Sequence, residues 1–449
     1  MADSFPSKSI AFFERAKVDS SIAEYSYEFI KPTDTIGAKE EDISLRIRAD
    51  STRFIDLKHT YLCATIKVLK DDGTNFKRIT ERNLDGVNVP KRDDPDNEYA
   101  TFIDNILYTM WSKVDIKLKD TVISTSDSLY PYKAYLDILL KMDANKKSFM
   151  HLVGHCADEN SYNKTNPYKD PANTGHSQRF AWTRSNRPFY MRGPLLTDIT
   201  QQDRILYHSK DLVFDFNAAK DDFRLMMQPV DLDAGIRLVD FGLNVARVKL
   251  QKGTMDGFNA NHKTTPVQYP FVKTKVLSLQ IPRNSRSKSF SDVFDGAIPF
   301  RMVFGLVDTD ARNGQADLNP FYFEHANMTA AKVKIGNRTF PEAEGYEFDF
   351  ASGKFVDAYE TLLRVFSPDN EPQDLGIDRE AYLEGLTLIP FILNPGTPGD
   401  LSVWGLPLTG ALELEIKFPA QTTKTYDVIV YASFPGNMEI DNDGEIAFL

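Results

Sequence analysis

The sequence predicts an all-β protein made of two eight-stranded antiparallel jelly rolls in tandem, with few short helices. Three observations predict it: the two halves of the chain repeat one unit, alternating strand patterns dominate, and long connections separate the strands. In the first half, ILYTMWSKVDIKLKDTVIS (106–124) precedes YPYKAYLDILLKM (130–142). In the second half, FYFEHANMTAAKVKIGNRTF (321–340) precedes GKFVDAYETLLRVF (353–366). So long a period indicates a duplicated domain rather than a solenoid.

The strands are predicted from their hydrophobic patterns. Both repeats begin with a run typical of a buried strand, YLCATIKVLK (61–70) and IPFRMVFGLV (298–307). Residues 113–124 and ALELEIKF (411–418) alternate apolar with polar side chains, which indicates strands with one core face and one polar face. YDVIVYASF (426–434) is apolar on both faces, so we expect it inside a sheet and covered on both sides.

Two amphipathic helices are expected. The first is Tyr132 to Met142, with Pro131 in its first turn. Its counterpart in the second repeat is Phe355 to Phe366. Each helix is expected to pack on its own barrel, and binding of a partner is the alternative. The apolar stripes consist of Tyr135, Leu136, Leu139 and Leu140 in the first helix, and of Tyr359, Leu362, Leu363 and Phe366 in the second.

The chain is expected to divide at QKGTMDGFNANHKTTP (251–266), a Gly/Asn/Lys-rich segment that follows a long strand pattern. Residues 71–98 and 143–187 have weak periodicity and are predicted to be long loops, and loops of this length are usually functional or disordered. The predicted parts are an N-terminal arm (1–19), a first jelly roll with long loops (20–252) and a second jelly roll (253–449).

Composition sets the broad class. A chain of 449 residues suggests two or more domains, and 42% hydrophobic with 26% charged residues is normal for a globular protein. The net charge of −11 offers no general attraction for nucleic acid, so no sequence-specific nucleic-acid binding is expected. The two cysteines, Cys63 and Cys156, cannot form a disulfide framework, and Cys63 is expected in the core. No apolar run is long enough for a membrane span, and the first 20 residues lack a signal-peptide core.

The search for chemistry leaves no committed catalytic, cofactor-binding or metal-binding residue, and we expect no cofactor and no enzymatic activity. His151 and His155 have the spacing of two metal ligands on a helix, but the glutamate of the zinc-protease motif is absent. No nucleophile elbow or phosphate-binding loop occurs. A glycosidase needs only two well-placed carboxylates, so a jelly-roll glycosidase or carbohydrate-binding protein acting as a soluble monomer remains the alternative. Asp349, Glu413 and Glu415 are interpreted as solvated strand residues.

Five segments resemble the major capsid protein of Polinton/Maverick elements and their adintovirus relatives. They occur in the family's order, and the resemblance covers about Glu24 to Glu445. Two positions depart from the family's pattern: Ser433 replaces an acidic residue, and residues 434–437 differ from its Phe-Asp-Asn. The segments are FIDLKHTYL (54–62), YPYKAYLDILL (130–140), DGAIPFRMVFGLVDTDARNG (295–314), NPFYFEHANMTAAKVKIGNRTFP (319–341) and VIVYASFPGNMEID (428–441).

The resemblance implies a double jelly roll whose homotrimer forms a pseudo-hexagonal capsomer of an icosahedral shell. It also implies neighbouring capsomers and penton-type and other minor capsid proteins as partners, a location in the virion, and synthesis in the host cytoplasm. Cleavage by a maturation protease of the adenovirus type is not supported, since no Gly-Gly or Gly-x-Gly site occurs near either end. The arm at residues 1–19 is expected on the inner side of the shell, where it would tie neighbouring capsomers together.

Overall fold

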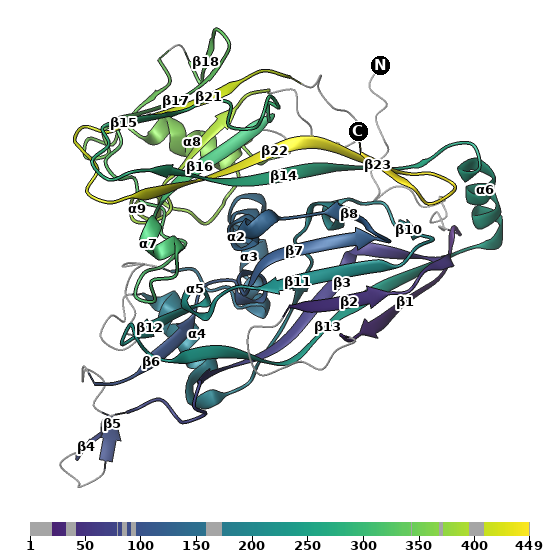
Figure 1. Cartoon of the computed structure of the whole chain (residues 1–449), viewed down its shortest axis with the longest axis horizontal. Helices are drawn as coiled ribbons and strands as arrows, with labels where there is room; N and C mark the ends of the chain where they lie inside the picture. Colours follow the sequence, from purple (N-terminus) through teal and green to yellow (C-terminus); the bar gives the residue numbers. More distant parts are fainter. Residues whose placement is uncertain are drawn as a thin grey trace, which may run out of the picture.

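The computed structural model contains two β-sandwiches of similar topology, joined along one side (Figure 1). The predicted arm at residues 1–19 lies outside the part of the chain that the structure describes. That part comprises residues 20–32, 42–78, 80–82, 88–90, 96–158, 173–342, 344–367, 371–394 and 408–448.

The first sandwich is a jelly roll. One sheet has the order β1-β13-β3-β10, and the other has the order β2-β11-β7-β8. A further strand, β9, also pairs with β3, at residues 61–66, whereas β10 pairs with it at residues 50–55. We therefore count β9 and β10 as two halves of one strand, which gives the eight-strand pattern of a jelly roll. The strands are β1 (Ile22–Ile30), β2 (Ile43–Ile47), β3 (Asp50–Lys70), β7 (Trp111–Leu118), β8 (Thr121–Ser124), β9 (Phe189–Pro194), β10 (Leu206–His208), β11 (Leu212–Ala218) and β13 (Ala234–Leu250).

The second sandwich repeats this order strand for strand. Its sheets are β14-β22-β16-β20 and β15-β21-β17-β18, with β23 and β19 added at β22 and β17. In both rolls the first strand pairs with the eighth, the eighth with the third, and the third with the sixth. The strands are β14 (Val267–Ile281), β15 (Ser287–Phe290), β16 (Arg301–Asp308), β17 (Ala330–Ile335), β18 (Arg338–Phe340), β19 (Tyr346–Glu347), β20 (Leu388–Ile392), β21 (Leu412–Lys417), β22 (Tyr426–Ile440) and β23 (Ile446–Phe448).

The hydrophobic patterns predicted β3, β7, β16, β21 and β22 correctly. In β7, the alternating residues Val114, Ile116 and Leu118 are buried in the core of the first roll. The run from Tyr426 to Ala432 in β22 is buried at every position, as expected of a strand covered on both faces. The double jelly roll predicted from the internal repeat is confirmed.

Both expected helices form, but the predicted loops hold more regular structure than their weak periodicity indicated. The helices are α2 (Tyr130–Lys141) and α8 (Val356–Arg364). Residues 71–98 contain a small hairpin, β4 (Thr80–Arg82) with β5 (Asn88–Pro90). The connection 251–266 is mostly helical, as α6 (Lys252–His262). The described residues within 143–187 form α3 (Ala144–Lys147), η3 (Met150–Val153), α4 (Thr174–Thr183) and η4 (Arg184–Asn186).

Short elements complete the described chain. They are α1 (Ile106–Thr109), α5 (Asp221–Arg224), α7 (Thr309–Arg312), α9 (Arg379–Leu383), η2 (Asp127–Leu129), η5 (Asp198–Gln201), and the strand pair β6 (Tyr99–Phe102) with β12 (Leu225–Gln228). No helix in the described ranges is both long and apolar enough to cross a membrane.

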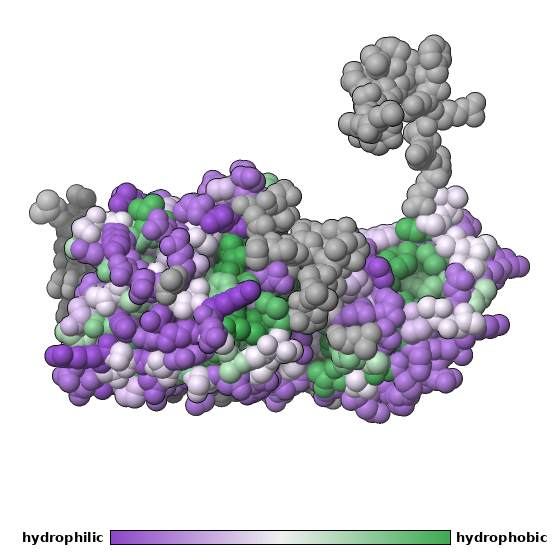
Figure 2. Space-filling model, turned by 90° about the horizontal axis from the view of Figure 1, so that it is seen from above, coloured by the Kyte–Doolittle hydropathy of each residue, from purple (hydrophilic) through white to green (hydrophobic). Residues whose placement is uncertain are grey.

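The surface on the side of the second roll is mainly hydrophilic. Figure 2 shows this side, with hydrophobic residues gathered in separate small areas between hydrophilic ones. In Figure 1, α2 lies between the two rolls, with β14 and β22 on one side and the strands of the first roll on the other. Helix α2 therefore marks the seam between the two rolls.

Candidate functional site

The seam between the rolls is built around α2, which is buried on all sides. Every residue from Tyr130 to Leu140 is buried. Tyr130, Ala134 and Ile138 belong to the core of the first roll. The other apolar residues of the helix belong to the core of the second roll: Tyr132, Tyr135, Leu136, Leu139 and Leu140. The expectation that this helix packs on its own barrel was therefore incomplete, because its predicted stripe faces the other barrel.

Aromatic rings fill the contact on the side of the second roll. The Tyr135 ring stacks on Phe321 with 4.2 Å between centroids and 1° between planes. Tyr132 meets the same ring edge to face at 5.5 Å. Phe321 lies in one of the five segments that resemble the Polinton/Maverick capsid protein (319–341), and α2 contains another (130–140). Two of the resembling segments therefore meet at the seam.

A buried ionic network crosses the same seam. The Lys133 ammonium is 2.8 Å from an Asp137 oxygen and 3.1 Å from an Asp198 oxygen, and its side chain is 3% exposed. Lys141 pairs with Asp137 at 2.6 Å. From the second roll, the Tyr431 hydroxyl donates to Asp137, and the Thr274 N–H donates to Asp198 at 2.8 Å.

The network stabilises the charged forms of Asp137 and Lys133. Burial raises the pKa of Asp137, but Lys133 and Lys141 outweigh burial and hold that pKa at about 2. Burial likewise lowers the pKa of Lys133, but Asp137 and Asp198 outweigh it and leave that pKa above its usual value. The stability contributed by Asp137 is therefore present above its unfolded-state pKa of about 4 and lost only as the pH falls through about 2.

This arrangement holds two domains together and leaves no carboxylate oxygen open to a substrate. Two cations balance two anions, and both oxygens of Asp137 and of Asp198 have partners. The sequence carried one signal for the network, because Lys133 and Asp137 are spaced i, i+4 in an otherwise apolar helix. It carried no signal for Asp198, which lies far along the chain in a segment without clear periodicity.

A buried arginine, Arg179, holds the segment 143–187 against the rest of the chain. Arg179 has no exposed side-chain surface, and it donates to the Phe102 carbonyl at 3.1 Å and to Asp158 at 2.8 Å. From the second roll, the Asn319 amide donates to the other Asp158 oxygen at 3.0 Å. The segment expected to be a loop is therefore tied to both rolls.

The candidate metal pair does not form a site. The helix with His151 ends at Gly154, whose φ of 83° is left-handed, so His155 lies beyond it. The Nδ1 atom of His155 is 2.8 Å from Asp104, and that of His151 is 3.1 Å from the Ser148 carbonyl. Within the described ranges, no group of three His, Cys, Asp or Glu side chains could hold a metal ion.

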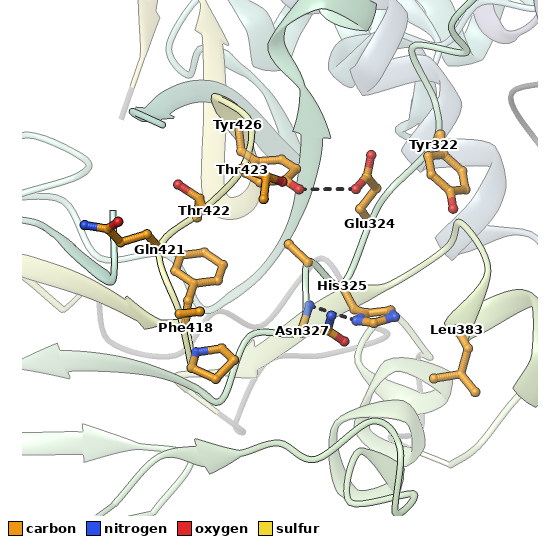
Figure 3. A pocket seen from close by; sticks show the side chains of 13 residues that line it. Tyr322, Glu324, His325, Asn327, Leu383, Phe418, Gln421, Thr422, Thr423 and Tyr426 are labelled. Carbon is orange, nitrogen blue, oxygen red and sulfur yellow. Dashed lines mark hydrogen bonds between the residues drawn. The ribbon is translucent and has the colours of Figure 1, made fainter. Parts of the chain in front are cut away.

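A surface pocket lies in the second roll (Figure 3). Its volume is about 350 Å³, and its lining contains a single carboxylate, Glu324. That carboxylate accepts from Lys424 at 2.9 Å and from the Tyr426 hydroxyl at 3.3 Å. His325 stacks on Phe350, and burial lowers its pKa. Because hydrolysis of a glycoside uses two opposed carboxylates, this pocket does not favour the glycosidase alternative.

The three candidate carboxylates of the sequence analysis lie apart from this pocket. Glu413 is half-buried on β21, and Asp349 is exposed beyond β19. Glu415 was wrongly interpreted as solvated: its side chain is 14% exposed, because Lys332, Lys334 and Lys417 cover it with ion pairs of 3.4, 3.2 and 3.1 Å.

A row of exposed aromatic side chains lies on β1, an edge strand. Tyr25, Tyr27 and Phe29 are 44%, 49% and 45% exposed, and we call them the β1 stripe. Each ring has a close neighbour: the Tyr25 and Tyr27 rings meet edge to face at 5.7 Å, and Phe29 lies over Gly242, where a Cβ atom would be 2.7 Å from its ring. Exposed apolar edge strands are usually protected, so this row indicates a contact surface.

Comparisons with known proteins agree with the fold. A chain of the Sputnik virophage structure aligns with a TM-score of 0.62 and 11% identity, over 99% of this chain and 92% of that one. The mavirus major capsid protein aligns with a TM-score of 0.54 and 10% identity, over 100% and 94%. The faustovirus major capsid protein gives 0.55 and 9%, over 95% and 92%. The double jelly roll is thus shared along the whole chain.

Sequence comparison gives one distant relative and no family. A Caenorhabditis elegans protein described as uncharacterized is 22% identical over 403 residues, which cover 87% of this chain and 89% of that protein. No protein-family model matches the chain.

Proposed function

We propose that this protein is the structural major capsid protein of a Polinton/Maverick-type element. Three copies would form a pseudo-hexagonal capsomer, and capsomers would tile an icosahedral shell. The observation that carries the proposal is the pair of complete jelly rolls in one chain, joined by a buried seam. Six similar barrels are needed for a pseudo-sixfold block, and fused pairs supply them from three chains.

The comparisons support this role, because the aligned mavirus and faustovirus chains are major capsid proteins and both align over nearly their full length. The five resembling segments support the Polinton/Maverick assignment. As a shell component, the protein would act without enzymatic activity or cofactor. It would reside in the virion, with neighbouring capsomers and penton-type minor proteins as partners.

Native mass tests the proposal. Analytical ultracentrifugation at micromolar concentration should give three times the 50.9 kDa mass of one chain. Electron microscopy of the same sample should show particles with a pseudo-hexagonal outline. A mass of one chain at every concentration would overturn the capsid proposal and favour the soluble carbohydrate-binding alternative.

A further inference from the structure

The repeat identifies equivalent surfaces on the two rolls. By strand order, β1 corresponds to β14 and β13 to β22, and the two helices that follow the fifth strand, α2 and α8, correspond as well. Residues 134–142 (AYLDILLKM) align with residues 358–366 (AYETLLRVF) without a gap. The alignment agrees with packing, since Ile138 and the equivalent Leu362 are at most 1% exposed, each in the core of its own roll.

Within one chain, the seam joins two of these surfaces. The first and eighth strands of the second roll, β14 and β22, pack against α2 and η5 of the first roll. Thr274 of β14 and Tyr431 of β22 reach Asp198 and Asp137 there. The helix after the fifth strand of one roll thus covers the first and eighth strands of the other.

Each of these surfaces has an uncovered counterpart. On the first roll, the strand equivalent to β14 is β1, and its stripe is exposed. On the second roll, the helix equivalent to α2 is α8. Tyr132, Leu136 and Leu140 of α2 face the second roll, and their equivalents in α8 are Val356, Glu360 and Arg364. Val356 is 45% exposed, and Arg364 pairs with Glu360 at 3.2 Å, with side chains 39% and 49% exposed.

We propose that the β1 stripe of one copy docks on the outer face of α8 (Val356, Glu360 and Arg364) of a second copy. The inference rests on the proposed trimer and names its contact. Each chain then offers one stripe and one helix face, so the contact is heterologous, and three copies close a ring. In that ring, every first and eighth strand is covered by the helix of a neighbouring roll, as the seam already covers β14 and β22.

The chemistry of the two surfaces is complementary. The stripe presents apolar ring faces and edges, which suit the Val356 side chain and the methylene groups of Arg364. A guanidinium group over a tyrosine ring adds a favourable cation–π contact. The contact is more polar than the seam, where the equivalent helix positions are Tyr132, Leu136 and Leu140. The docked copies should therefore separate under milder conditions than those that unfold the chain.

Substitution in the stripe tests the contact. Tyr27→Glu should weaken trimer formation about thirtyfold or more, the range of an aromatic hot spot, as measured by ultracentrifugation over a concentration series. Glu24→Gln, on the opposite face of the same strand, is the matched control and should leave the trimer intact. Circular dichroism and thermal unfolding should show that the Tyr27→Glu monomer is folded. A folded Tyr27→Glu variant that trimerises like the wild type overturns the proposal.

Cross-linking tests the partner surface. In a background with Cys63→Ala and Cys156→Ser, the double variant Tyr27→Cys with Glu360→Cys should give covalent trimers on treatment with a short bismaleimide. Each single variant should give none. Covalent dimers from Tyr27→Cys alone would indicate a two-fold contact and overturn the proposal.

Two outcomes distinguish failure of this contact from failure of the proposed capsid function. A wild-type trimer without cross-links at these positions rejects the contact and leaves the capsid proposal standing, whereas a wild-type monomer rejects both. The chain segment before β1 is the other candidate occupant. If deletion of residues 2–19 makes the introduced thiol of the Tyr27→Cys variant, diluted until the protein is monomeric, react faster with a maleimide, that segment covers the stripe and the proposal is wrong.

Discussion

Asp137 is the residue on which the seam depends most, because it accepts from three groups at once. Lys133 and Lys141 come from its own helix, and Tyr431 comes from the other roll. Removal of one partner from a buried ion pair leaves an uncompensated charge, which costs more than replacement of both partners by apolar groups.

Asp137→Asn should lower the free energy of unfolding by about 3–5 kcal/mol, because buried Lys133 then keeps only Asp198 as a counter-charge. Urea denaturation at pH 7 measures the change. The double variant Lys133→Met with Asp198→Asn leaves Asp137 paired with Lys141, so it should lose less than Asp137→Asn alone. Lys354→Met removes an exposed pair with Glu347 and should cost less than about 1 kcal/mol. Equal losses for all three variants would contradict this account of the seam.

His208 makes the first roll sensitive to acid. Burial is the main cause that lowers its pKa to about 4, and the charge of Arg247 adds to it, while Asp50 and Asp211 act in the opposite direction. The Arg247 guanidinium lies 3.0 Å from Nε2 and can only donate, so Nε2 must accept and stay unprotonated. Glu28 of β1 holds Arg247 from the other side at 3.0 Å.

The unfolded chain therefore binds a proton to His208 at a higher pH than the folded chain does. Stability should fall as the pH decreases from about 6.5 to about 4, by up to about 3 kcal/mol. Urea denaturation at pH 7 and pH 4.5 measures the loss, and His208→Gln should lack this part of it. A wild type and a His208→Gln variant with the same pH dependence would show that His208 is not the responsible group.

At the scale of elements, α2 and α8 occupy equivalent positions in the repeat and lie in different environments. Leu136 of α2 is 1% exposed at the seam, whereas Glu360 occupies the same repeat position on the exposed face of α8. The two helices share the positions that face their own barrels, such as Ala134 and Ala358, neither of which is exposed. Positions that face the helix's own barrel therefore have the same residue type in both repeats. On the opposite face, the position of Leu136 is apolar in α2, where the other roll covers it, and polar in α8, where it is exposed.

Leu136→Ala should lower the free energy of unfolding by about 2–5 kcal/mol, because it opens a cavity between the rolls. Glu360→Ala, its repeat equivalent, should cost less than about 0.5 kcal/mol in the monomer, since it removes only an exposed i, i+4 pair with Arg364. Chemical denaturation of both variants at low protein concentration gives the comparison. A large loss for Glu360→Ala would contradict the equivalence drawn between the two helices.

At the scale of the whole molecule, we expect the segments 71–98 and 143–187 of the first roll to form the outward towers of the capsomer. They are the long polar insertions of the sequence, and the connections of a barrel leave it at its ends. Limited proteolysis of assembled particles, with peptide mapping, should place the first cuts there. Cuts confined to the second roll would refute the orientation.

The N-terminal arm is expected to act in assembly and not in folding. Ile10, Phe12 and Phe13 form a small apolar patch beside basic residues in residues 1–19. Burial of each phenylalanine on a neighbour could contribute ~1.5–3 kcal/mol, less the entropy of ordering the arm. Deletion of residues 2–19 should therefore leave a folded trimer and impair formation of shells, as seen by electron microscopy. Normal particles from the deleted protein would remove the arm from the mechanism.

The sequence by itself determined the repeat, the strands and the class of fold. Alternation along a strand and the stripe of a helix are local patterns, so they can be detected in β7, β22 and α2 without knowledge of their neighbours. The doubly apolar run at 426–434 even predicted a cover on both faces. The helices within 143–187 were missed, because α3, η3 and η4 are too short to show a helical period. The ten-residue α4 (TGHSQRFAWT) was missed because its apolar residues are adjacent, at 180–182, and form no helical stripe.

Only the tertiary structure decided which surfaces meet. Asp198 pairs with Lys133 although 65 residues separate them in the sequence, and Tyr431 contacts Asp137 across 294 residues. A local periodic pattern cannot predict contacts between residues so far apart in the sequence. The burial of Leu136 and the exposure of Tyr27 likewise depend on how one roll is placed on the other. An apolar side chain gives the same sequence pattern whether a neighbouring element covers it or leaves it exposed. Its burial depends on the packing of the whole chain.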